Sequence, residues 1–207
     1  MNIIYNETRK QELILKHLLP VLGYTIDVKG EEMQDLLCNC KLIEASAYEI
    51  LEVPGNRSEG VLWFPIHAMS HFYYYNQEHN IHTGIRIWNR KDVILDPDSL
   101  FEDNKRKYTL QILENSEVLS ISYTNLDYLM QKYKDMERAI INISVNCTLY
   151  AQNKLYLLYR PELERIDQFR RENYLFTICA SLEIQAMHLN IKSKAYLDYA
   201  NKLNDVN

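Results

Sequence analysis

Apolar residues recur at helical spacing near both ends of the chain and at shorter, strand-like spacing in the middle. The segment 7–40 has a leucine-rich helical face that is interrupted near Pro20 and Gly23. A second short helix fits Glu31 to Cys38, where Met33 occupies the inward face. The pattern therefore predicts a helical start to the fold.

From Lys41 the chain changes to short stretches rich in β-branched and aromatic residues, separated by turn residues. Turn composition is clearest at Pro54-Gly55-Asn56 and at Asp96-Pro97-Asp98. Short strands at this spacing predict a sandwich or a small barrel. The predicted strands lie near residues 48–53, 61–66, 70–75, 83–88, 92–95, 108–113 and 117–122.

Helical spacing returns near Asn125, and residues 135–159 contain neither glycine nor proline. A helix of roughly 24 residues would be about 36 Å long, more than a small barrel needs for its own cover. Its broad apolar face predicts pairing with the same helix of a second copy, although the helix could instead lie along its own barrel. The predicted dimer contacts are Ile140, Ile143, Cys147, Tyr150 and Ala151.

The last part of the chain has the pattern of several short helices. Pro161 suits the first turn of one helix, and an irregular stretch is expected over 173–181. Leu182 to Leu203 then fits two helices joined at Asn190, a residue that tolerates the left-handed conformation. This arrangement predicts either a helix-turn-helix or an ordinary helical hairpin.

The second of these two helices has distinct inner and outer faces, with Ser193 expected to cap its start. The residues expected on the inner face are Tyr196, Tyr199, Ala200 and Leu203. The residues expected on the outer face are Ser193, Lys194, Leu197, Asp198 and Asn201.

Composition narrows the function classes. The 207 residues carry a net charge of −5, which argues against nucleic-acid binding driven by overall charge but allows a local basic patch. No apolar run approaches the ~18–20 residues of a membrane span, so no membrane partner is expected. The first residues lack the layout of a signal peptide, and Cys38 and Cys40 are too close together for a zinc knuckle. We therefore predict a cytoplasmic protein with reduced thiols.

The order of elements, with five short motifs, resembles the Crp/Fnr family of bacterial transcription regulators. Arg165 to Phe169 (RIDQF) and Ile191 to Leu203 resemble the family's helix-turn-helix region. In the barrel, Pro54-Gly55 resembles the turn after the first long strand, and Ile94 to Phe101 (ILDPDSLF) occupies the place of the phosphate-cradling segment. Ser116 to Tyr123 (SEVLSISY) resembles the final barrel strand.

This resemblance implies an α+β fold with an N-terminal β-barrel, a double-stranded β-helix or jelly roll of the cyclic-nucleotide-binding type. A long central dimerisation helix and a C-terminal winged helix-turn-helix would follow. The implied domains are a barrel at 1–130, a dimerisation helix at 131–160 and a DNA-binding-like domain at 161–207. The implied partners are a second copy of the chain and promoter DNA.

The cradle segment departs from the pattern of family members that bind a cyclic nucleotide. Those members carry Gly-Glu and later an arginine followed by small residues, whereas this chain has Leu95-Asp96-Pro97, and Pro97 offers no backbone donor. Arg106 could supply the cation, but Lys107-Tyr108 replaces the small pair. The candidate effector-pocket residues are Asp96, Ser99, Arg106 and Lys107. We expect no cyclic nucleotide and no other cofactor, in an empty or altered pocket whose small-molecule effector is unidentified.

Other sensing chemistries are less well supported by the residues. The scattered cysteines do not suit an iron–sulfur cluster. A haem could be held through one of four histidines in the strand-rich region, for which packing or surface positions are the simpler explanation. These are His67, His71, His79 and His82.

The predicted DNA-binding surface is also unusual. Base contacts in the family fall on positions matching Ser193, Lys194 and Asp198, and the last is usually an arginine that can bind a guanine edge. From Pro161 onward there are six Lys or Arg and seven Asp or Glu, a net charge of −1. The candidate DNA-binding residues are Lys192, Ser193, Lys194, Asp198, Asn201, Lys202, Arg170 and Arg171.

Two functions follow from these observations. The first is a homodimeric DNA-binding transcription regulator of the Crp/Fnr type, and the second is a regulator-like sensor that has lost sequence-specific DNA binding. An enzyme is not expected, because the chain shows no glycine-rich phosphate loop and no His-Glu metal motif. The pair Asp96 and Asp98 is ordinary turn chemistry, so no catalytic or metal-binding residue is predicted.

Overall fold

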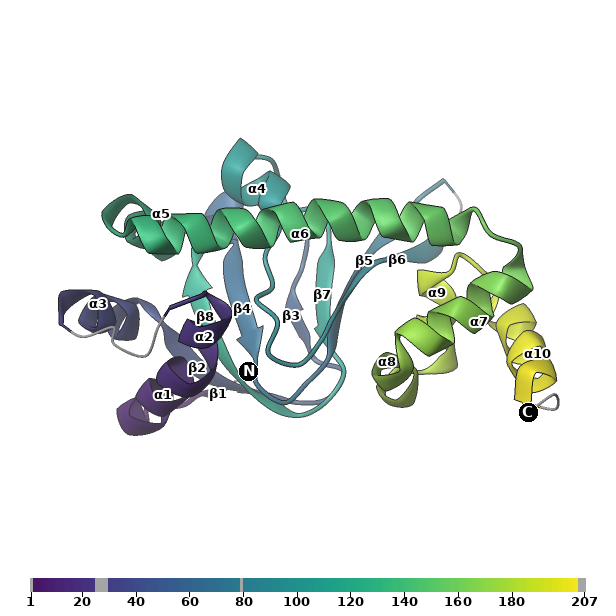
Figure 1. The fold of residues 1–207 in the computed structure, drawn as a ribbon, viewed down its shortest axis with the longest axis horizontal. Coiled ribbons are helices and arrows are strands. Elements are labelled where there is room, and N and C mark those ends of the chain that lie inside the picture. Colours follow the sequence, from purple (N-terminus) through teal and green to yellow (C-terminus); the bar gives the residue numbers. More distant parts are fainter. Residues whose placement is uncertain (1, 25–29, 79, 205–207) are drawn as a thin grey trace.

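The computed structural model describes residues 2–24, 30–78 and 80–204, except for the side chains of Ala200, Leu203 and Asn204. The N-terminal helices and the β-sheets form one end of an elongated molecule, and short helices form the other end (Figure 1). One long helix, α6 (Lys134–Leu158), runs along the sheets and ends above the C-terminal helices. The molecule is therefore α+β, as the sequence predicts.

Two four-stranded antiparallel sheets form the barrel, with strand orders β1-β2-β8-β4 and β3-β7-β5-β6. Their core lies between the sheets, where Trp63 of the first sheet belongs to the same buried cluster as Phe72 and Trp88 of the second. The strands are β1 (Asn2–Ile3), β2 (Lys41–Ala45), β3 (Ile50–Glu52), β4 (Val61–Pro65), β5 (Ser70–Asn76), β6 (Ile81–Trp88), β7 (Thr109–Ile112) and β8 (Ser116–Ser122).

Helices cover both ends of the barrel. Pro20 lacks the backbone donor that a regular helix needs, and the turns just before it widen into the π-helix η1 (Ile14–Leu18). The remaining helices are α1 (Glu7–Leu13), α2 (Leu19–Val21), α3 (Glu31–Asn39), the 3-10 helix η2 (Arg57–Glu59), α4 (Pro97–Glu102), α5 (Tyr123–Lys132), α7 (Glu162–Glu172), α8 (Tyr174–Cys179), α9 (Leu182–His188) and α10 (Ser193–Asn204).

Several elements differ from the sequence predictions. The strand β2 was not expected, because Leu42 and Ile43 are both buried and the apolar alternation is lost. The predicted strand at 92–95 is only a single bridge between Ile94 and Trp63. The predicted turn at Asp96-Pro97-Asp98 begins helix α4, since proline suits the first turn of a helix as well as a β-turn.

The predicted irregular stretch 173–181 is also wrong in its centre, where helix α8 forms. Its sequence, YLFTIC, is rich in aromatic and β-branched residues, which favour helices weakly. Packing overrides this tendency, because the buried Phe176 ring meets the rings of Phe169 at 6.0 Å and His188 at 5.2 Å. Tertiary contacts thus decide the local structure here.

The C-terminal helices share a core with the barrel. The buried cluster around Phe169, Phe176 and Tyr196 also includes Met69 and Ile87 from the barrel. Residues 161–204 contain helices and no strands, so a wing is not part of the described chain. The orientation of these helices is therefore fixed by contacts with the barrel as well as by the connection to α6.

Candidate functional site

The turn between α9 and α10 has the geometry that the sequence predicts. Asn190 adopts the left-handed conformation with φ of 52°, and the Ser181 hydroxyl accepts a hydrogen bond from Ile184 N at the start of α9. Helix α10 begins at Ser193 itself, so this residue is the first helical position rather than the residue before it.

The inner face of α10 is fixed by a buried polar contact. The hydroxyl of the fully buried Tyr196 donates to Gln185 Oε1 at 2.6 Å. The amide of Gln185 in turn donates to the carbonyls of Thr177 and Ala180, at 3.0 and 2.7 Å. Tyr199 is half-buried as predicted, while the inward predictions for Ala200 and Leu203 fall on side chains outside the described residues. These contacts hold α10 in one rotation about its axis.

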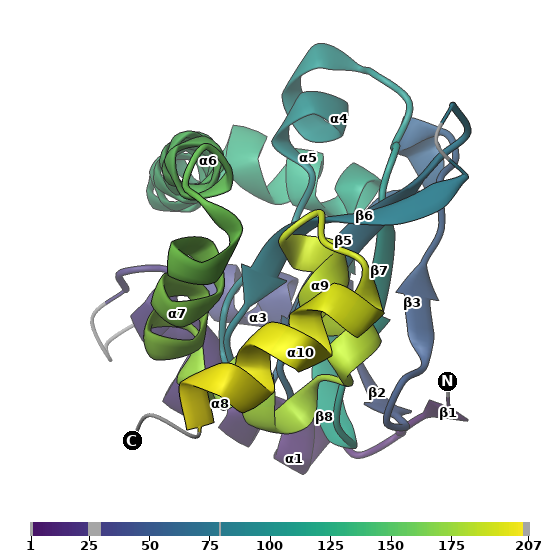
Figure 2. The ribbon, with the colours of Figure 1, turned by 90° about the vertical axis from the view of Figure 1, so that its right-hand side faces the viewer.

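The outer face of α10 is open to solvent. Helix α10 lies in front of α9 when the C-terminal end is viewed directly (Figure 2). The exposed predicted DNA contacts are Lys192, Ser193, Lys194, Asp198, Asn201 and Lys202. The structure therefore brings these six residues together on one accessible surface, which we call the α10 surface.

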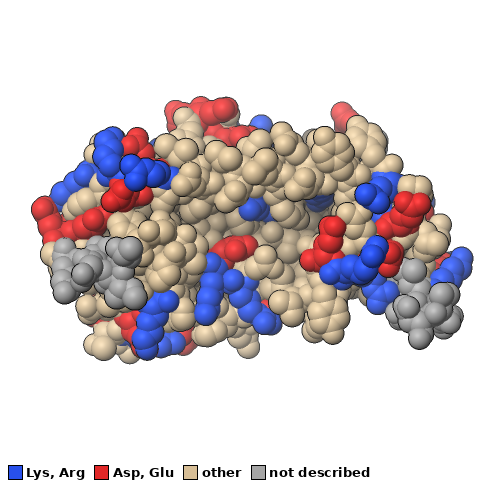
Figure 3. Space-filling model, viewed as in Figure 1, with Lys and Arg blue, Asp and Glu red and all other residues tan. Residues whose placement is uncertain are grey.

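The two predicted arginines lie on α7 and are less available. Arg171 forms an ion pair with Asp167 at 2.7 Å, and Arg170 is half-buried. Positive and negative side chains are mixed over the C-terminal helices (Figure 3). The α10 surface, with three lysines and Asp198, is thus the more basic part of this end of the molecule.

The five predicted dimer contacts on α6 mostly face their own protomer. Ile140 is fully buried in the core cluster with α5, and Ile143 packs against that cluster. Cys147 packs against the barrel core, and the hydroxyl of Tyr150 accepts a hydrogen bond from Ile87 N at 3.2 Å. Only Ala151 is exposed. Ile140 is therefore wrong as a dimer contact, because it is fully buried in its own protomer. Ile143, Cys147 and Tyr150 are half-buried against the barrel and stay predictions.

A second stripe of α6 remains exposed. Its members are Ile141, Val145, Leu149 and Leu155, which are 46%, 53%, 50% and 56% exposed. We call these four residues the α6 stripe. Helical spacing of about four residues places the first three on one side of the helix, away from the barrel.

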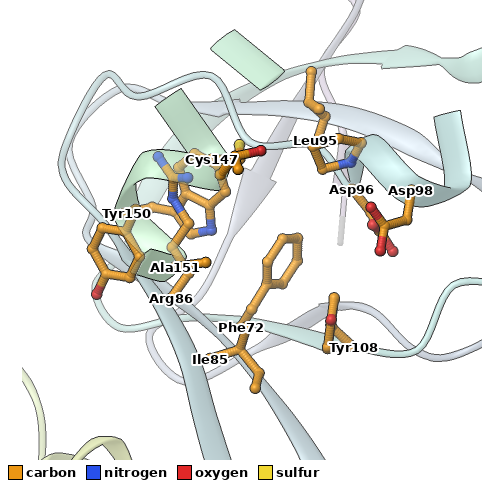
Figure 4. A pocket seen from close by; sticks show the side chains of 13 residues that line it. Phe72, Ile85, Arg86, Leu95, Asp96, Asp98, Tyr108, Cys147, Tyr150 and Ala151 are labelled. Carbon is orange, nitrogen blue, oxygen red and sulfur yellow. The ribbon is translucent and has the colours of Figure 1, made fainter. Parts of the chain in front are cut away.

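A cavity of about 230 Å³ lies between the barrel and α6. Figure 4 shows Arg86 and Tyr150 on one side of it and Asp96 and Asp98 on the other. The residues that line it are Phe72, Ile85, Arg86, Trp88, Leu95, Asp96, Pro97, Asp98, Tyr108, Cys147, Thr148, Tyr150 and Ala151. We call this space the barrel cavity.

Arg86 is the cation of the barrel cavity, and the sequence analysis missed it. Its guanidinium carbon lies 3.7 Å from the centre of the Trp88 ring and 4.9 Å from that of Tyr150. Its Nε and Nη1 atoms are buried and have no hydrogen-bond partner among the described residues. Burial lowers the pKa of Arg86 from its usual value. One sequence feature could have located Arg86. It lies two residues before Trp88 on β6, and side chains two apart on a strand point to the same face of the sheet.

Arg106, the predicted cation, is engaged elsewhere. It forms an ion pair with the buried Glu52 at 2.9 Å and donates to the carbonyls of Val53 and Asn56, each at 3.0 Å. A Cβ atom at Gly55 would lie 2.5 Å from Arg106 Nη2, so glycine is needed there for the close approach. Arg106 does not line the barrel cavity, and its guanidinium is already paired with carboxylates and carbonyls of the barrel, so the structure does not place the predicted cation in this cavity.

The other three predicted pocket residues differ in their positions. Asp96 lines the barrel cavity, and its burial raises the pKa of its carboxyl to about 6. Ser99 is buried, and its hydroxyl has no hydrogen-bond partner among the described residues, whereas Lys107 is exposed outside the cavity. Only Asp96 of the predicted set therefore faces this space.

The described cysteines and histidines occupy packed or surface positions. All four cysteines are free thiols. His71 is buried between Gln111 and His188, His67 and His82 are exposed, and His79 lies outside the described residues. Among the described residues, no group of three His, Cys, Asp or Glu side chains is placed to hold a metal ion.

No protein-family model and no curated protein sequence matches the chain. Solved structures do match. A transcriptional regulator of the Crp/Fnr family from Eubacterium rectale superposes with a TM-score of 0.72 at 11% identity, over 86% of this chain and 84% of that chain. The chain has the Crp/Fnr fold.

Two further Crp/Fnr-like structures cover most of both chains. The c-di-GMP-responsive global regulator CLP from Xanthomonas campestris has a TM-score of 0.67 at 16% identity, over 84% of this chain and 91% of that chain. A variant of CooA from Carboxydothermus hydrogenoformans has a TM-score of 0.66 at 12% identity, over 92% and 85%. In the described part of the chain, no helix is both long enough and apolar enough to span a bilayer.

Proposed function

We propose that this protein is a homodimeric DNA-binding transcription regulator of the Crp/Fnr type, controlled by a small molecule bound in the barrel cavity. The α10 surface is the observation that carries this proposal. Its six polar side chains are exposed while Tyr196 and Gln185 fix the opposite face, which suits insertion of a rigid helix into a major groove. The Crp/Fnr fold supports the same function.

The α6 stripe supports the dimer. Four large apolar side chains on one long helix are about half-exposed, and pairing with the same helix of a second copy would bury them. A twofold axis near α6 would also set two α10 helices at a fixed separation. About 34 Å is needed for successive major grooves.

The barrel cavity supports control by a ligand. Its wall includes Tyr150 and Ala151 of α6 as well as Arg86 of β6, so a bound molecule would contact both the barrel and the helix. A ligand that binds one arrangement of α6 more tightly shifts the population toward that arrangement. Arg86 offers two unused donor atoms, which favours a ligand with an anionic or carbonyl oxygen. A cyclic nucleotide is still not expected, because Pro97 interrupts the cradle.

A sequence-selection experiment followed by gel-shift titration tests the proposal. Lys194→Glu should weaken binding of the selected duplex at least about tenfold, because a cation at the groove is replaced by an anion. Lys107→Glu makes the same charge change on the barrel and should leave binding unchanged. If the native protein binds no duplex above the non-specific level at low salt, the DNA-binding proposal is wrong.

A second function has one specific observation in its favour. Asp198 is exposed on the α10 surface, where a carboxylate is repelled by DNA phosphates. In a regulator-like sensor without sequence-specific DNA binding, such a residue would not impair function. Asp198→Asn separates the two functions, since it should change duplex selectivity in a DNA-binding protein and change nothing in a sensor.

A further inference from the structure

The barrel, α6 and the C-terminal helices meet at one buried cluster of nitrogen-containing side chains. His71 Nδ1 on β5 and His188 Nε2 on α9 are 3.2 Å apart, and both rings are almost fully buried. A Cβ atom at Gly84 would lie 2.6 Å from the His188 ring, so this ring rests directly on the backbone of β6. Lys154 of α6 donates to the carbonyls of Gly84 and Ile85.

Lys154 has no counter-ion at this junction among the residues that the structure describes. No carboxylate forms an ion pair with it in the described part of the chain, and two strand carbonyls are its only hydrogen-bond partners there. Burial lowers the pKa of Lys154 to about 7. His71 and His188, the titratable groups facing it from β5 and α9, have pKa values lowered mainly by burial and add no negative charge. An ammonium group in this position would be stabilised by an anion.

A cavity of about 180 Å³ opens beside this cluster, between α6 and α7. We call it the junction cavity. Lys154 and His188 line it, together with the polar side chains of Asn153 and Asn173 and the apolar side chains of Leu157 and Phe169. The space-filling view shows a hollow beneath α6 in which Lys or Arg side chains are recessed (Figure 3).

One acidic side chain also lines the junction cavity. Glu172 of α7 accepts a hydrogen bond from Gln168 at 2.7 Å and is exposed. Tyr150 of α6 lines both this cavity and the barrel cavity, so the two spaces are neighbours. The junction cavity thus combines one uncompensated cation, amide groups and apolar walls. Its volume is well above the roughly 10–15 Å³ that one water needs.

We propose that the junction cavity is a second binding site, for a small organic monocarboxylate with a short apolar chain. The carboxylate would be held by Lys154, with the amide of Asn153 and the second N–H of the Asn173 amide as further donors, since Asn173 Nδ2 already donates to Phe169 O at 3.1 Å. The chain would lie against Leu157 and Phe169. A single cation matches a single negative charge, and the apolar walls distinguish this ligand from inorganic phosphate. Such a ligand would contact α6 and the C-terminal helices together.

Isothermal titration of the full chain with acetate, propionate, butyrate and isobutyrate tests this site, with chloride and inorganic phosphate as tail-free anions. We expect saturable binding of at least one monocarboxylate. Lys154→Met should weaken it more than tenfold, and Lys154→Arg should retain it. Arg86→Met removes the cation of the other cavity and should leave it unchanged, as should Lys194→Glu, so the outcome is independent of DNA binding.

Proton uptake provides a second measurement on the unmodified protein. Binding of an anion beside a partly neutral lysine must charge that lysine, so titrations in two buffers of different ionisation enthalpy at pH 8 should show uptake of nearly one proton per ligand. The absence of binding by every carboxylate would overturn the proposal. Binding without proton uptake, or binding that persists in Lys154→Met, would also overturn it.

Discussion

Two arginines of the barrel have opposite surroundings. Arg106 is paired with the carboxylates of Glu52 and Glu59, and it also donates to backbone carbonyls, so the barrel uses its charge internally. Arg86 lies against the rings of Trp88 and Tyr150 with two buried donor atoms unused. The first region is complete without a ligand, while the second is not. A cationic side chain that the sequence places near a pocket is therefore evidence of ligand binding only when its donor atoms lack hydrogen-bond partners within the protein.

The largest change in unfolding free energy should follow from removal of the charge at Arg106. Arg106→Met leaves Glu52 buried and uncompensated, which typically costs about 3–5 kcal/mol of unfolding free energy. Chemical denaturation followed by circular dichroism measures this change. The double variant Glu52→Gln, Arg106→Met should recover part of the loss, and a single-variant loss below about 1 kcal/mol would contradict a structural role for Arg106.

Asp96, on the opposite side of the barrel cavity from Arg86, should have an intermediate effect on stability, which appears as a pH dependence of the unfolding free energy. The pKa of Asp96 is about 6 in the folded protein, against a usual value of 3.8. The folded state therefore binds this proton more tightly. Its stabilising contribution is fully present below about pH 4, and it is lost as the pH rises through 6. The loss is at most about 3 kcal/mol.

Thermal unfolding from pH 4 to pH 7 checks this dependence. The Asp96→Asn variant should lack this component, so the difference between native and variant melting curves should grow with pH. Other acids, such as Glu114 and Glu117, have lowered pKa values and act in the opposite direction, but they contribute equally to both proteins. If the melting temperatures of the native protein and the Asp96→Asn variant changed in parallel with pH, Asp96 would not be in a desolvated position.

The smallest effect on stability is expected at Arg86. Arg86→Met loses the contact with Trp88, worth about 0.5–1 kcal/mol, but it also removes a desolvated charge. The unfolding free energy should change by no more than about 1 kcal/mol. A loss as large as that of Arg106→Met would mean that Arg86 is structural too, and the contrast between the two regions would disappear.

The order of elements was predictable because each depends on local spacing. The long helix without glycine or proline is present as α6, and Asn190 turns the chain between α9 and α10 as expected. Helix α8 was missed because its residues favour helices weakly, and only the contacts of Phe176 stabilise it. Strand β2 was missed because adjacent buried residues hide the period of two.

The candidate site was predictable on α10 and much less so elsewhere. The outer face of an amphipathic helix follows from its own residues, so the six α10 positions are exposed as expected. The pocket cation and the exposed stripe of α6 depend on which face of β6 and α6 meets the barrel. The sequence offered two apolar stripes on α6, and it did not distinguish the one centred on Ile140 from the exposed one.

By itself, the sequence determined most of the helices and strands and the polar face of α10, because these depend on residues close together in the chain. Tertiary structure decided the rest. It paired Arg106 with Glu52, which lies 54 positions earlier in the chain, and it left two donor atoms of Arg86 without a partner among the described residues. It also brought Lys154 of α6 to the carbonyls of β6. The physical reason is that charge compensation depends on neighbours in space, which residue spacing along the chain does not specify.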